Sequence, residues 1–287
     1  GSQTPLENVQ ITEEVASELG YPVMLKAVAG GGGRGMRRAD NAAQLADAYE
    51  RCRSEAETAF GNGAVFVEKF IDRPRHIEVQ VLADKATNVI HLHERDCSVQ
   101  LNNQKVIEVA PAPNLDPALR DRMLSDAIRL IREANYENAG TVEFLVDTQG
   151  QYFFLEMNTR LQGEHGITEA ITGLDLVEWQ LLVAAGAELP LKQDQIEIKG
   201  HAIEARICAE DPAEDFLPST GAIEYMTLPE TAPAVRFDMG YVTGDRVSSY
   251  YDSLLGKLIV WGPDRQAAVR KICETLGSTL IAGIDSN

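Results

Sequence analysis

Two apolar, aromatic-rich runs around the turn Thr-Gln-Gly-Gln, within residues 141–158, restrict the fold of this chain more than any other segment. Such a pattern predicts a β-hairpin. Pairing the runs about the middle of the turn places Glu143 opposite Glu156. The same register places Thr141 opposite Asn158, on the same face of the hairpin.

The two opposed glutamates predict either a metal site or a solvated surface. Like charges directly opposite each other across strands are destabilising, and a cation between them would reverse the sign. Carboxylate oxygens with the Asn158 amide beside them suit Mg²⁺ or Mn²⁺, which also bind phosphate oxygens. The alternative is a solvated hairpin face on which Glu143 and Glu156 have no common role.

The composition is that of a globular protein and excludes several classes of partner. The 287 residues are 44% hydrophobic and 24% charged, with a formal net charge of -18. This charge argues against binding to nucleic acid or to an anionic membrane, and no stretch approaches the ~18 apolar residues of a membrane span. Scattered cysteines and a start without signal-peptide character favour a reducing compartment. We therefore expect a cytoplasmic protein, or one of the mitochondrial matrix in a eukaryote.

Helical and strand patterns are mixed in the first 70 residues. Residues 9–19 and 41–60 show helical spacing of apolar positions, and Asp40 or Asn41 caps the second helix. Strands are expected at 21–28, 35–38 and 64–70. This part of the chain therefore predicts a small α/β unit.

After residue 70 the pattern becomes that of an antiparallel sheet. Residues 76–82 and 88–93 alternate apolar and polar positions, as strands with one buried face do. Helices are expected at about 116–135 and 174–186, and short strands from His201 onward. The predicted fold class is α+β with a mainly antiparallel sheet.

The glycine tract Gly30–Gly33 predicts a phosphate-covering loop or a mobile surface hairpin. It is not a P-loop, because no Gly-Lys-Ser/Thr follows, and it joins two strands instead of opening a helix. Its backbone N–H groups could close over phosphates, and Lys26 on the preceding strand could reach the same anion. A glycine run alone is a weak signal.

Two further segments each allow a functional and a structural interpretation. Glu68 and Lys69 end the small unit, where extended backbone could contact an adenine edge; the alternative is an edge strand with exposed charges. Lys105 follows a polar loop and enters an apolar stretch, so it is partly desolvated near an anion or is an ordinary exposed lysine.

The densest polar cluster directly follows the opposed glutamates. Arg160 offers a fork for a planar anion, Gln162 adds an amide, Glu164 is a possible general base, and His165 has a titratable ring. Such groups suit a small anion such as bicarbonate or a carboxylate. Arg206 is either a second anion contact or the partner of a nearby glutamate, Glu204 or Glu210.

Together, these segments closely resemble the biotin carboxylase component of biotin-dependent carboxylases, an ATP-grasp family, over essentially the whole chain. The segments that carry the resemblance are Lys26 with Gly30–Gly35, Glu68-Lys69, residues 74–80, 94–98 and 104–105, Glu143, residues 156–160, Gln162, Glu164-His165, residues 206–212 and residues 251–257.

The resemblance implies a division into three parts. They are an ATP-grasp lid at residues 1–70, an ATP-grasp core with the metal and bicarbonate site at 71–198, and a truncated biotin carboxylase C-terminal region at 199–287. We expect the family's amino-terminal subdomain to be missing from this chain.

The resemblance also implies the site residues. ATP contacts would come from Lys26, Gly31, Gly32, Gly33, Glu68, Lys69, Ile71, His76, Gln100, Glu143 and Glu156, and metal ligands from Glu143, Glu156 and Asn158. Bicarbonate and biotin would be held by Lys105, Arg160, Gln162, the backbone at Gly163, Glu164 and Arg206.

The implied reaction uses ATP, Mg²⁺ or Mn²⁺, and bicarbonate. Bicarbonate, deprotonated by Glu164, attacks the γ-phosphate to give carboxyphosphate, and CO₂ then passes to N1 of biotin, whose enolate Arg206 stabilises. The implied partners are a biotin carboxyl carrier domain, which presents biotin as the substrate, a carboxyltransferase subunit and a second copy of the chain. Within the family, residues 176–180 look more like the methylcrotonyl- or propionyl-CoA enzymes than the pyruvate enzyme.

Two departures from the family pattern lead us to expect impaired turnover. Residues 101–103 are Leu-Asn-Asn where the family has Arg-Arg-His, a loss of positive charge near the nucleotide. Gly163 and Gly166 replace larger residues around Glu164, and ordering each glycine costs roughly 0.5–1 kcal/mol more than ordering alanine. A nucleotide-binding module without carboxylase turnover is therefore an alternative. A carboxylate–amine ligase of the ATP-grasp class is another, but the retained Arg160, Gln162, Glu164 and Arg206 argue against it.

Overall fold

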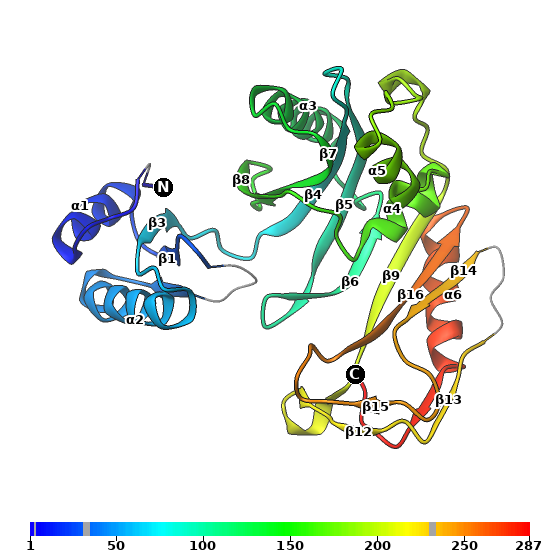
Figure 1. Cartoon of the computed structure of the whole chain (residues 1–287). Helices are drawn as coiled ribbons and strands as arrows, with labels where there is room; N and C mark the ends of the chain where they lie inside the picture. The colour runs from blue at the N-terminus through cyan, green and yellow to red at the C-terminus, as the bar shows by residue number, and fades with distance from the viewer. Residues whose placement is uncertain (3, 31–34, 230–233) are drawn as a thin grey trace. The chain divides into compact units, whose positions relative to one another are not determined.

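The computed structural model describes residues 1–2, 4–30, 35–229 and 234–287, and these residues form two structural units (Figure 1). The first unit contains residues 1–73 together with 101–104. The second contains residues 74–100 and 105–287.

The first unit is a three-stranded antiparallel sheet packed against two helices. The strand order is β2-β1-β3, and apolar side chains such as Leu25 and Val67 are fully buried beneath the helices. Asn41 caps the second helix through its side chain, as one of the two predicted caps. The predicted elements of this region are confirmed: α1 Val9–Leu19, β1 Val23–Ala27, β2 Met36–Ala39, α2 Ala42–Phe60 and β3 Val65–Lys69.

The second unit is built on an eight-stranded sheet in the order β14-β16-β9-β6-β5-β4-β7-β8. Every strand pairing within it that the structure describes is antiparallel, which confirms the predicted α+β class with a mainly antiparallel sheet. The strands are β4 Arg75–Ala83, β5 Val89–Leu101, β6 Gln104–Ala110, β7 Asn138–Val146, β8 Tyr152–Asn158, β9 His201–Cys208, β14 Val235–Met239 and β16 Leu254–Gly262. The helices are α3 Pro117–Glu133, α4 His165–Thr172, α5 Leu176–Ala184 and α6 Arg265–Gly277.

Shorter elements complete the second unit. Strands β12 and β15 pair with each other, as do β10 with β11 and β13 with β17. Their bounds, with those of two 3-10 turns, are η1 Gln193–Gln195, β10 Glu210–Asp211, η2 Pro212–Glu214, β11 Leu217–Pro218, β12 Gly221–Ala222, β13 Tyr225–Thr227, β15 Arg246–Val247 and β17 Leu280–Ala282.

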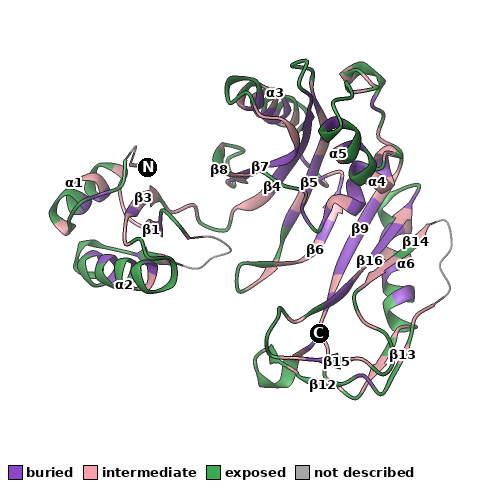
Figure 2. Cartoon of the chain, in the orientation of Figure 1, coloured by how far each residue is buried: buried purple, intermediate pink, exposed green. Residues whose placement is uncertain are grey.

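The two faces of the large sheet differ in chemistry. Along β4, Ile77 and Val79 pack into the apolar cluster beneath α3, whereas the alternate residues Glu78 and Gln80 are buried and polar. The same alternation occurs on β9, where odd-numbered apolar residues pack beneath α6 and Glu204 faces the other way. Figure 2 shows that these strands are buried along most of their length. We call the side that carries Glu78, Gln80 and Glu204 the polar face.

The β7–β8 hairpin confirms the predicted register where it bears on function. Glu143 pairs with Glu156, and Thr141 pairs with Asn158. The prediction is wrong beyond that point, because a β-bulge between Glu143 and Phe144 shifts the register by one residue toward the turn. A bulge of this kind bends the strand locally, and the hydrophobic pattern alone does not reveal it.

Three features of the second unit differ from the sequence prediction. Helix α4 begins at His165, within a segment that the glycines indicated to be a loop. Helix α6 was not predicted, and β9 and β16 are longer than the short strands expected after His201. None of the helices in the described residues has the length and hydropathy that a membrane span requires.

The departure at residues 102 and 103 has a structural role. Both Asn102 (φ 50°) and Asn103 (φ 64°) have left-handed backbone conformations in the two-residue turn between β5 and β6. Tight hairpin turns of this kind require positive φ, and asparagine tolerates it better than most residues. The Asn-Asn sequence therefore suits the backbone conformation of this turn, and this structural role is separate from any effect on nucleotide affinity.

Candidate active site

A fully buried arginine organises the polar face of the large sheet. Arg95 lies on β5, and its Nε donates to Glu78 Oε1 at 2.6 Å. Its Nη1 donates to Gln80 on β4 at 2.6 Å and to Thr168 on α4 at 2.9 Å. Its Nη2 donates to Thr141 on β7 at 3.2 Å. A buried cation requires such partners, so Arg95 ties two strands and a helix to one centre.

Lys105 lies at the centre of three carboxylates, a group we call the lysine-centred cluster. Its Nζ donates to Glu78 Oε2 at 2.5 Å, Glu164 Oε1 at 2.5 Å and Glu143 Oε1 at 3.1 Å. The Lys105 side chain is 12% exposed, so the predicted partial desolvation is confirmed over the exposed alternative. The ammonium provides the positive charge that keeps three buried carboxylates together.

The lysine-centred cluster shifts the pKa values of its members. Burial alone would raise the pKa of Glu78, but Arg95 and Lys105 beside it lower that pKa to about 2. Burial is likewise overcome at Glu143, where hydrogen bonding from His76 and the charge of Lys105 lower the pKa to about 2. Burial opposes the charge on Lys105, yet the three carboxylates raise the pKa of its ammonium above its ordinary value.

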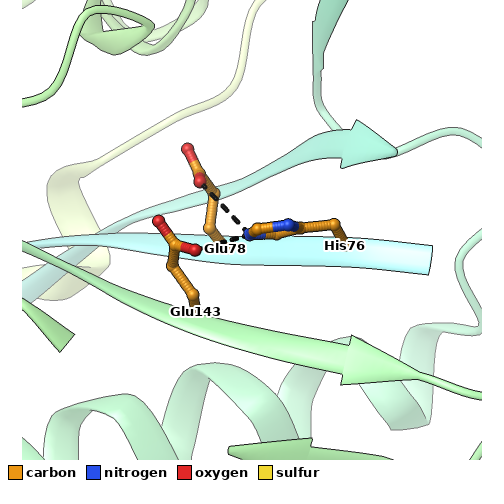
Figure 3. A group of neighbouring side chains, drawn as sticks. All are labelled: His76, Glu78 and Glu143. Carbon is orange, nitrogen blue, oxygen red and sulfur yellow. Dashed lines mark hydrogen bonds and ion pairs between the residues drawn. The ribbon is translucent and has the colours of Figure 1, made fainter. Parts of the chain in front are cut away.

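His76 extends the cluster along β4 (Figure 3). Its Nε2 lies 2.6 Å from Glu143 Oε2 and 4.0 Å from Glu78 Oε2, and its Nδ1 accepts from Gln100 at 2.9 Å. His76, Glu78 and Glu143 are close enough to share a metal ion. The Lys105 ammonium already contacts both carboxylates, so the group has a compensating charge of its own.

The donor set at the β7–β8 pair fits a hard divalent cation. Asn158 Nδ2 donates to Glu143 Oε1 at 2.9 Å and to Glu156 Oε1 at 3.3 Å, so the two opposed carboxylates converge on one amide. Glu156 is exposed, and among the described residues its carboxylate accepts a hydrogen bond from Asn158 alone. Glu143 is buried and accepts several hydrogen bonds. The Asn158 Oδ1 atom instead accepts from Arg160 Nη2 at 3.4 Å, so the amide group would have to rotate before its oxygen could join the two carboxylates. In that orientation the set of carboxylate and amide oxygens would suit Mg²⁺ or Mn²⁺.

The segment between β8 and α4 carries the predicted base. Glu164 directly precedes α4 and is 2% exposed. Its Oε1 accepts from Lys105, and its Oε2 accepts from Arg206 Nη2 at 2.9 Å. Gln162 Nε2 donates to Glu143 Oε1 at 2.9 Å, and Gly163 O accepts from Lys257 Nζ. The carboxylate of Glu164 is therefore held between two cations from different strands.

Gly166 and Gly163 have different surroundings. A Cβ at Gly166 would overlap Ile259 Cδ1 of β16, so glycine allows α4 to lie close to the sheet. A Cβ at Gly163 would make ordinary contact with Arg206 Nη2 at 3.7 Å. The interpretation of both glycines as loosening a loop around Glu164 is therefore incomplete, because Gly166 is part of a packed helix.

The structure corrects the predicted ion pair of Arg206. Its partners are Glu108 on the neighbouring strand β6, at 2.7 Å, and Glu164, not Glu204 or Glu210. Glu204 precedes it by two residues on the same strand, but the sheet brings Glu108 nearer to the guanidinium. Sequence proximity could not show this, because the β6–β9 pairing joins residues that are 98 apart.

Two predicted residues lie at the margin of the buried cluster. Arg160 is exposed and donates to Leu161 O at 3.2 Å and to Asn158 Oδ1 at 3.4 Å. His165 is part of α4, and its Nδ1 lies 2.7 Å from Gln162 O. Burial and the charge of Lys257 lower the pKa of His165, which fits the structural role that the sequence also allowed.

Three of the predicted ATP contacts of the first unit, Lys26, Glu68 and Lys69, have partners within that unit. Lys26 Nζ pairs with Glu68 Oε2 at 2.5 Å, and Lys69 Nζ donates to Gly20 O at 2.6 Å. Ile71 is partly buried just after β3. The remaining three predicted contacts, Gly31, Gly32 and Gly33, lie outside the described residues.

Sequence reasoning assigned no role to several residues of this centre. Glu78, Arg95 and Lys257 lie in segments that carry the family resemblance, but the sequence analysis gave them no function. The signal that could have found Glu78 was the alternation in β4, which places it on the same face as His76. The same alternation in β9 places Glu204 on one face with Arg206, but the sequence does not show that Glu108 pairs with it.

Comparison with known proteins places this geometry in a family. Residues 1–192 match the family described as "Carbamoyl-phosphate synthase L chain, ATP binding domain", which defines an ATP-grasp class. Residues 204–287 match the "Biotin carboxylase C-terminal domain". The chain belongs to the biotin carboxylase family of ATP-grasp proteins.

Individual relatives agree with this placement. The "Biotin carboxylase" of Nostoc sp. is 50% identical over 284 residues, covering 99% of this chain and 63% of the relative. The rat "Methylcrotonoyl-CoA carboxylase subunit alpha, mitochondrial" is 48% identical over 275 residues, covering 96% of this chain and 38% of the relative.

A solved structure agrees as well. The biotin carboxylase domain dimer of Hydrogenobacter thermophilus 2-oxoglutarate carboxylase, in complex with MgADP, ADP and bicarbonate, superposes with a TM-score of 0.97 at 46% identity. That comparison covers 100% of this chain and 63% of the other. The chain thus spans 63% of the length of the Nostoc relative and of this solved structure, and 38% of the length of the rat relative.

Proposed function

We propose that this chain carries out ATP- and bicarbonate-dependent carboxylation of biotin, as the biotin carboxylase part of a biotin-dependent acyl-CoA carboxylase. The observation that carries the proposal is the position of Glu164 between Lys105 and Arg206 on the polar face. A buried carboxylate between two cations is equipped to take a proton from a small anion held by the same cations.

The residues of the cluster would act on bicarbonate as follows. Lys105 and Arg206 attract the anion, and the anion replaces one of their contacts with Glu164. Gln162 and Arg160 supply further donors, and the exposed Arg160 is free to move toward the anion. Glu164 then accepts the bicarbonate proton as the substrate oxygen attacks the γ-phosphate of ATP, giving carboxyphosphate and ADP.

A divalent cation held by Glu143, Glu156 and Asn158 would neutralise charge on the phosphates during this transfer. The ring of His76 lies beside the carboxylate of Glu143. Hydrogen bonds with Glu143 and Gln100 fix its orientation. In the first unit, Lys26 and the glycine tract would contact the phosphates, and Glu68, Lys69 and Ile71 the adenine. Those assignments rest on the family resemblance.

Arg206 would also stabilise the biotin enolate that receives CO₂ at N1. The biotin would be presented by a carrier domain and passed to a carboxyltransferase subunit, as the family resemblance implies. The name of the rat relative, subunit alpha of a carboxylase, is consistent with an enzyme of several subunits. The dimer named in the 2-oxoglutarate carboxylase structure supports a homodimer. We also propose that the lid ends at residue 70 and the core at residue 198, with the C-terminal region following. The proposed location is the cytoplasm, or the mitochondrial matrix in a eukaryote.

The test is bicarbonate-dependent ADP release by this chain, with and without free biotin. Glu164→Gln should lower the rate by roughly 10²–10⁴-fold, the contribution of a general base. The exposed Glu197 supplies a matched control, because Glu197→Gln makes the same chemical change away from the site. Unchanged turnover in Glu164→Gln would contradict the proposed role of the base.

A nucleotide-binding module without turnover is the second candidate. The Asn102–Asn103 turn favours it, because this turn lacks the cationic side chains expected there. ATP binding by the native chain, measured by calorimetry, without ADP release in bicarbonate and biotin would support this second function.

A further inference from the structure

Two glutamates other than the proposed base Glu164 are buried beside Arg206. Glu108 on β6 and Glu204 on β9 are directly opposite each other in the antiparallel register. Both are 0% exposed and lie on the polar face, beneath α4. Like charges in this arrangement repel each other, and burial makes the repulsion stronger.

The carboxyl oxygens of this pair have too few donors for two carboxylates. Glu108 Oε1 accepts from Arg206 Nε at 2.7 Å. Within the described part of the chain, Glu108 Oε2 and both oxygens of Glu204 have no hydrogen-bond partner. A buried carboxylate without donors is costly, and a proton would give the pair the O–H donor that it lacks.

The nearby cations are each shared with another carboxylate. Arg206 also contacts Glu164, and Lys257 Nζ lies 3.7 Å from Glu204 Oε2 and 3.6 Å from Asp238 Oδ2. The surrounding titratable and charged groups are Arg206 on β9, Lys257 on β16, Asp238 on β14, Glu164 before α4, His165 and Glu169 on α4, Lys105 on β6, Arg95 on β5 and Glu78 on β4. Two full negative charges on the pair would therefore exceed the positive charge available to it.

Electrostatics agrees with the geometry. Burial, followed by the charge of Glu108, raises the pKa of Glu204 to about 8, despite Lys257. Burial raises the pKa of Glu108 to about 7, despite Arg206. The pKa of both carboxyl groups is therefore raised, chiefly because burial disfavours the charged form.

We propose that Glu108 and Glu204 share a single proton at neutral pH, and that the one remaining negative charge positions Arg206 for its contact with Glu164. Glu108 keeps the charge that accepts from Arg206 Nε, and Glu204 holds the proton. In this arrangement Arg206 Nη2 remains free to hold Glu164. The two glutamates are positioning residues, because neither of them touches the substrate.

This inference has a consequence for turnover that rests on the proposed function. Loss of the shared proton to solvent at alkaline pH leaves a second negative charge behind Arg206. The guanidinium is then drawn toward the pair and away from Glu164. Bicarbonate-dependent turnover should therefore fall above about pH 8, the pH at which Glu204 releases its proton.

Infrared spectroscopy of the full chain tests the shared proton without any need for activity. The carbonyl stretch of a protonated carboxyl is resolved from carboxylate bands and shifts in D₂O. We expect this band at pH 7 in the native chain and in the exposed control Glu197→Gln, and its loss in Glu204→Gln. Absence of the band from the native chain at pH 7, or its retention in Glu204→Gln, overturns the proposal.

Matched variants test the positioning role. Glu204→Gln keeps the shape and replaces the O–H donor by N–H, so turnover at pH 7 should stay within about two-fold and its alkaline fall should disappear. Glu108→Gln removes the charge that holds Arg206 and should lower turnover about ten-fold or more at every pH. A purely structural role predicts similar behaviour of both variants and an unchanged pH profile, and that result overturns the positioning role.

The two proposals fail in different ways. If the native chain shows no bicarbonate-dependent turnover but the infrared band behaves as expected, the proposed function fails and the shared proton stands. If turnover is present and depends on Glu164, but the Glu204→Gln pH profile matches the native one, the positioning role fails alone.

Discussion

The polar face of the large sheet carries two groups of buried glutamates that differ in how their charge is compensated. In the lysine-centred cluster, Glu78, Glu143 and Glu164 all contact one ammonium. In the second group, the carboxyl pair of Glu108 and Glu204, Glu108 accepts a hydrogen bond from Arg206, whose guanidinium also contacts Glu164. Glu204 has no hydrogen-bond donor among the described residues. The lysine-centred cluster is thus held by charge, and the carboxyl pair requires a proton.

The difference shows that burial alone does not determine the state of a carboxyl group. Glu78 and Glu204 are both 0% exposed on the same sheet face, yet the pKa of Glu78 is lowered to about 2 and that of Glu204 is raised to about 8. Desolvation acts in the same direction on both, and the number of cations in contact decides the sign of the shift.

The largest expected effect comes from removing the ammonium at the centre of the first group. Lys105→Met should lower the free energy of unfolding by about 3–5 kcal/mol, because three buried carboxylates lose their shared cation. Urea unfolding at pH 7 measures this change. The exposed pair of Lys85 and Glu137, 3.8 Å apart, supplies the control, since Lys85→Met should cost no more than about 1 kcal/mol. Similar small losses in both variants would break the comparison.

The carboxyl pair should make stability depend on pH between about 4.5 and about 8. Because the folded state raises the pKa of Glu204, it binds more protons than the unfolded chain, and stability falls as pH rises from about 4.5 to about 8. The resulting loss of stability is on the order of 4–5 kcal/mol, because the two pKa values differ by about 3.5 units. Glu204→Gln should remove most of the slope in unfolding experiments between pH 5 and pH 8, values set by these pKa limits. A native chain of constant stability over that range would contradict the raised pKa.

The lysine-centred cluster should act at the acid end with the opposite sign. Because the pKa of Glu78 is lowered in the folded state, its contribution is complete above about pH 4.5 and is lost as pH falls toward 2. The loss is on the order of 3 kcal/mol for this group. Unfolding free energies at successive pH values below 4.5 measure it, and Glu78→Gln should show a shallower decline than the native chain.

The smallest expected effect sharpens the role of α4, which covers both groups. Gly166→Ala adds a methyl that overlaps Ile259 Cδ1, and overpacking of this kind costs about 1–3 kcal/mol. The higher helix propensity of alanine returns up to about 1 kcal/mol, so a net loss of about 1 kcal/mol is expected. Gly166→Ala combined with Ile259→Val should recover most of it in thermal unfolding. A stabilised single variant would show that α4 has room against β16.

Much of the fold could be predicted because its signals are local. The bounds of α1 match the helical spacing of residues 9–19, and pairing the two runs about the middle of the turn set Glu143 opposite Glu156. Helix α4 was missed because its first turn contains Gly166, whose role is a close approach to β16. Local propensity and long-range packing conflict there, and the packing decides.

The candidate site could be predicted only in part, because its charges are paired across the sheet. Glu143, Lys105 and Glu164 were singled out from the sequence, and the structure brings them together. The partner of Arg206 was predicted wrongly, and the pairing of Glu108 with Glu204 was not predicted at all. Strand order decides both contacts, and the hydrophobic pattern of a single strand does not contain it.

The hydrogen bonds of Arg95 have a consequence for how this part of the protein opens. The guanidinium has acceptors on β4, β7 and α4, so detachment of α4 would leave a buried cation with fewer partners. Local fraying of the helix that follows Glu164 is therefore penalised. Backbone amides of α4 should exchange with deuterium as slowly as those of the central strands, so that the proposed base loses its setting only when the whole unit unfolds.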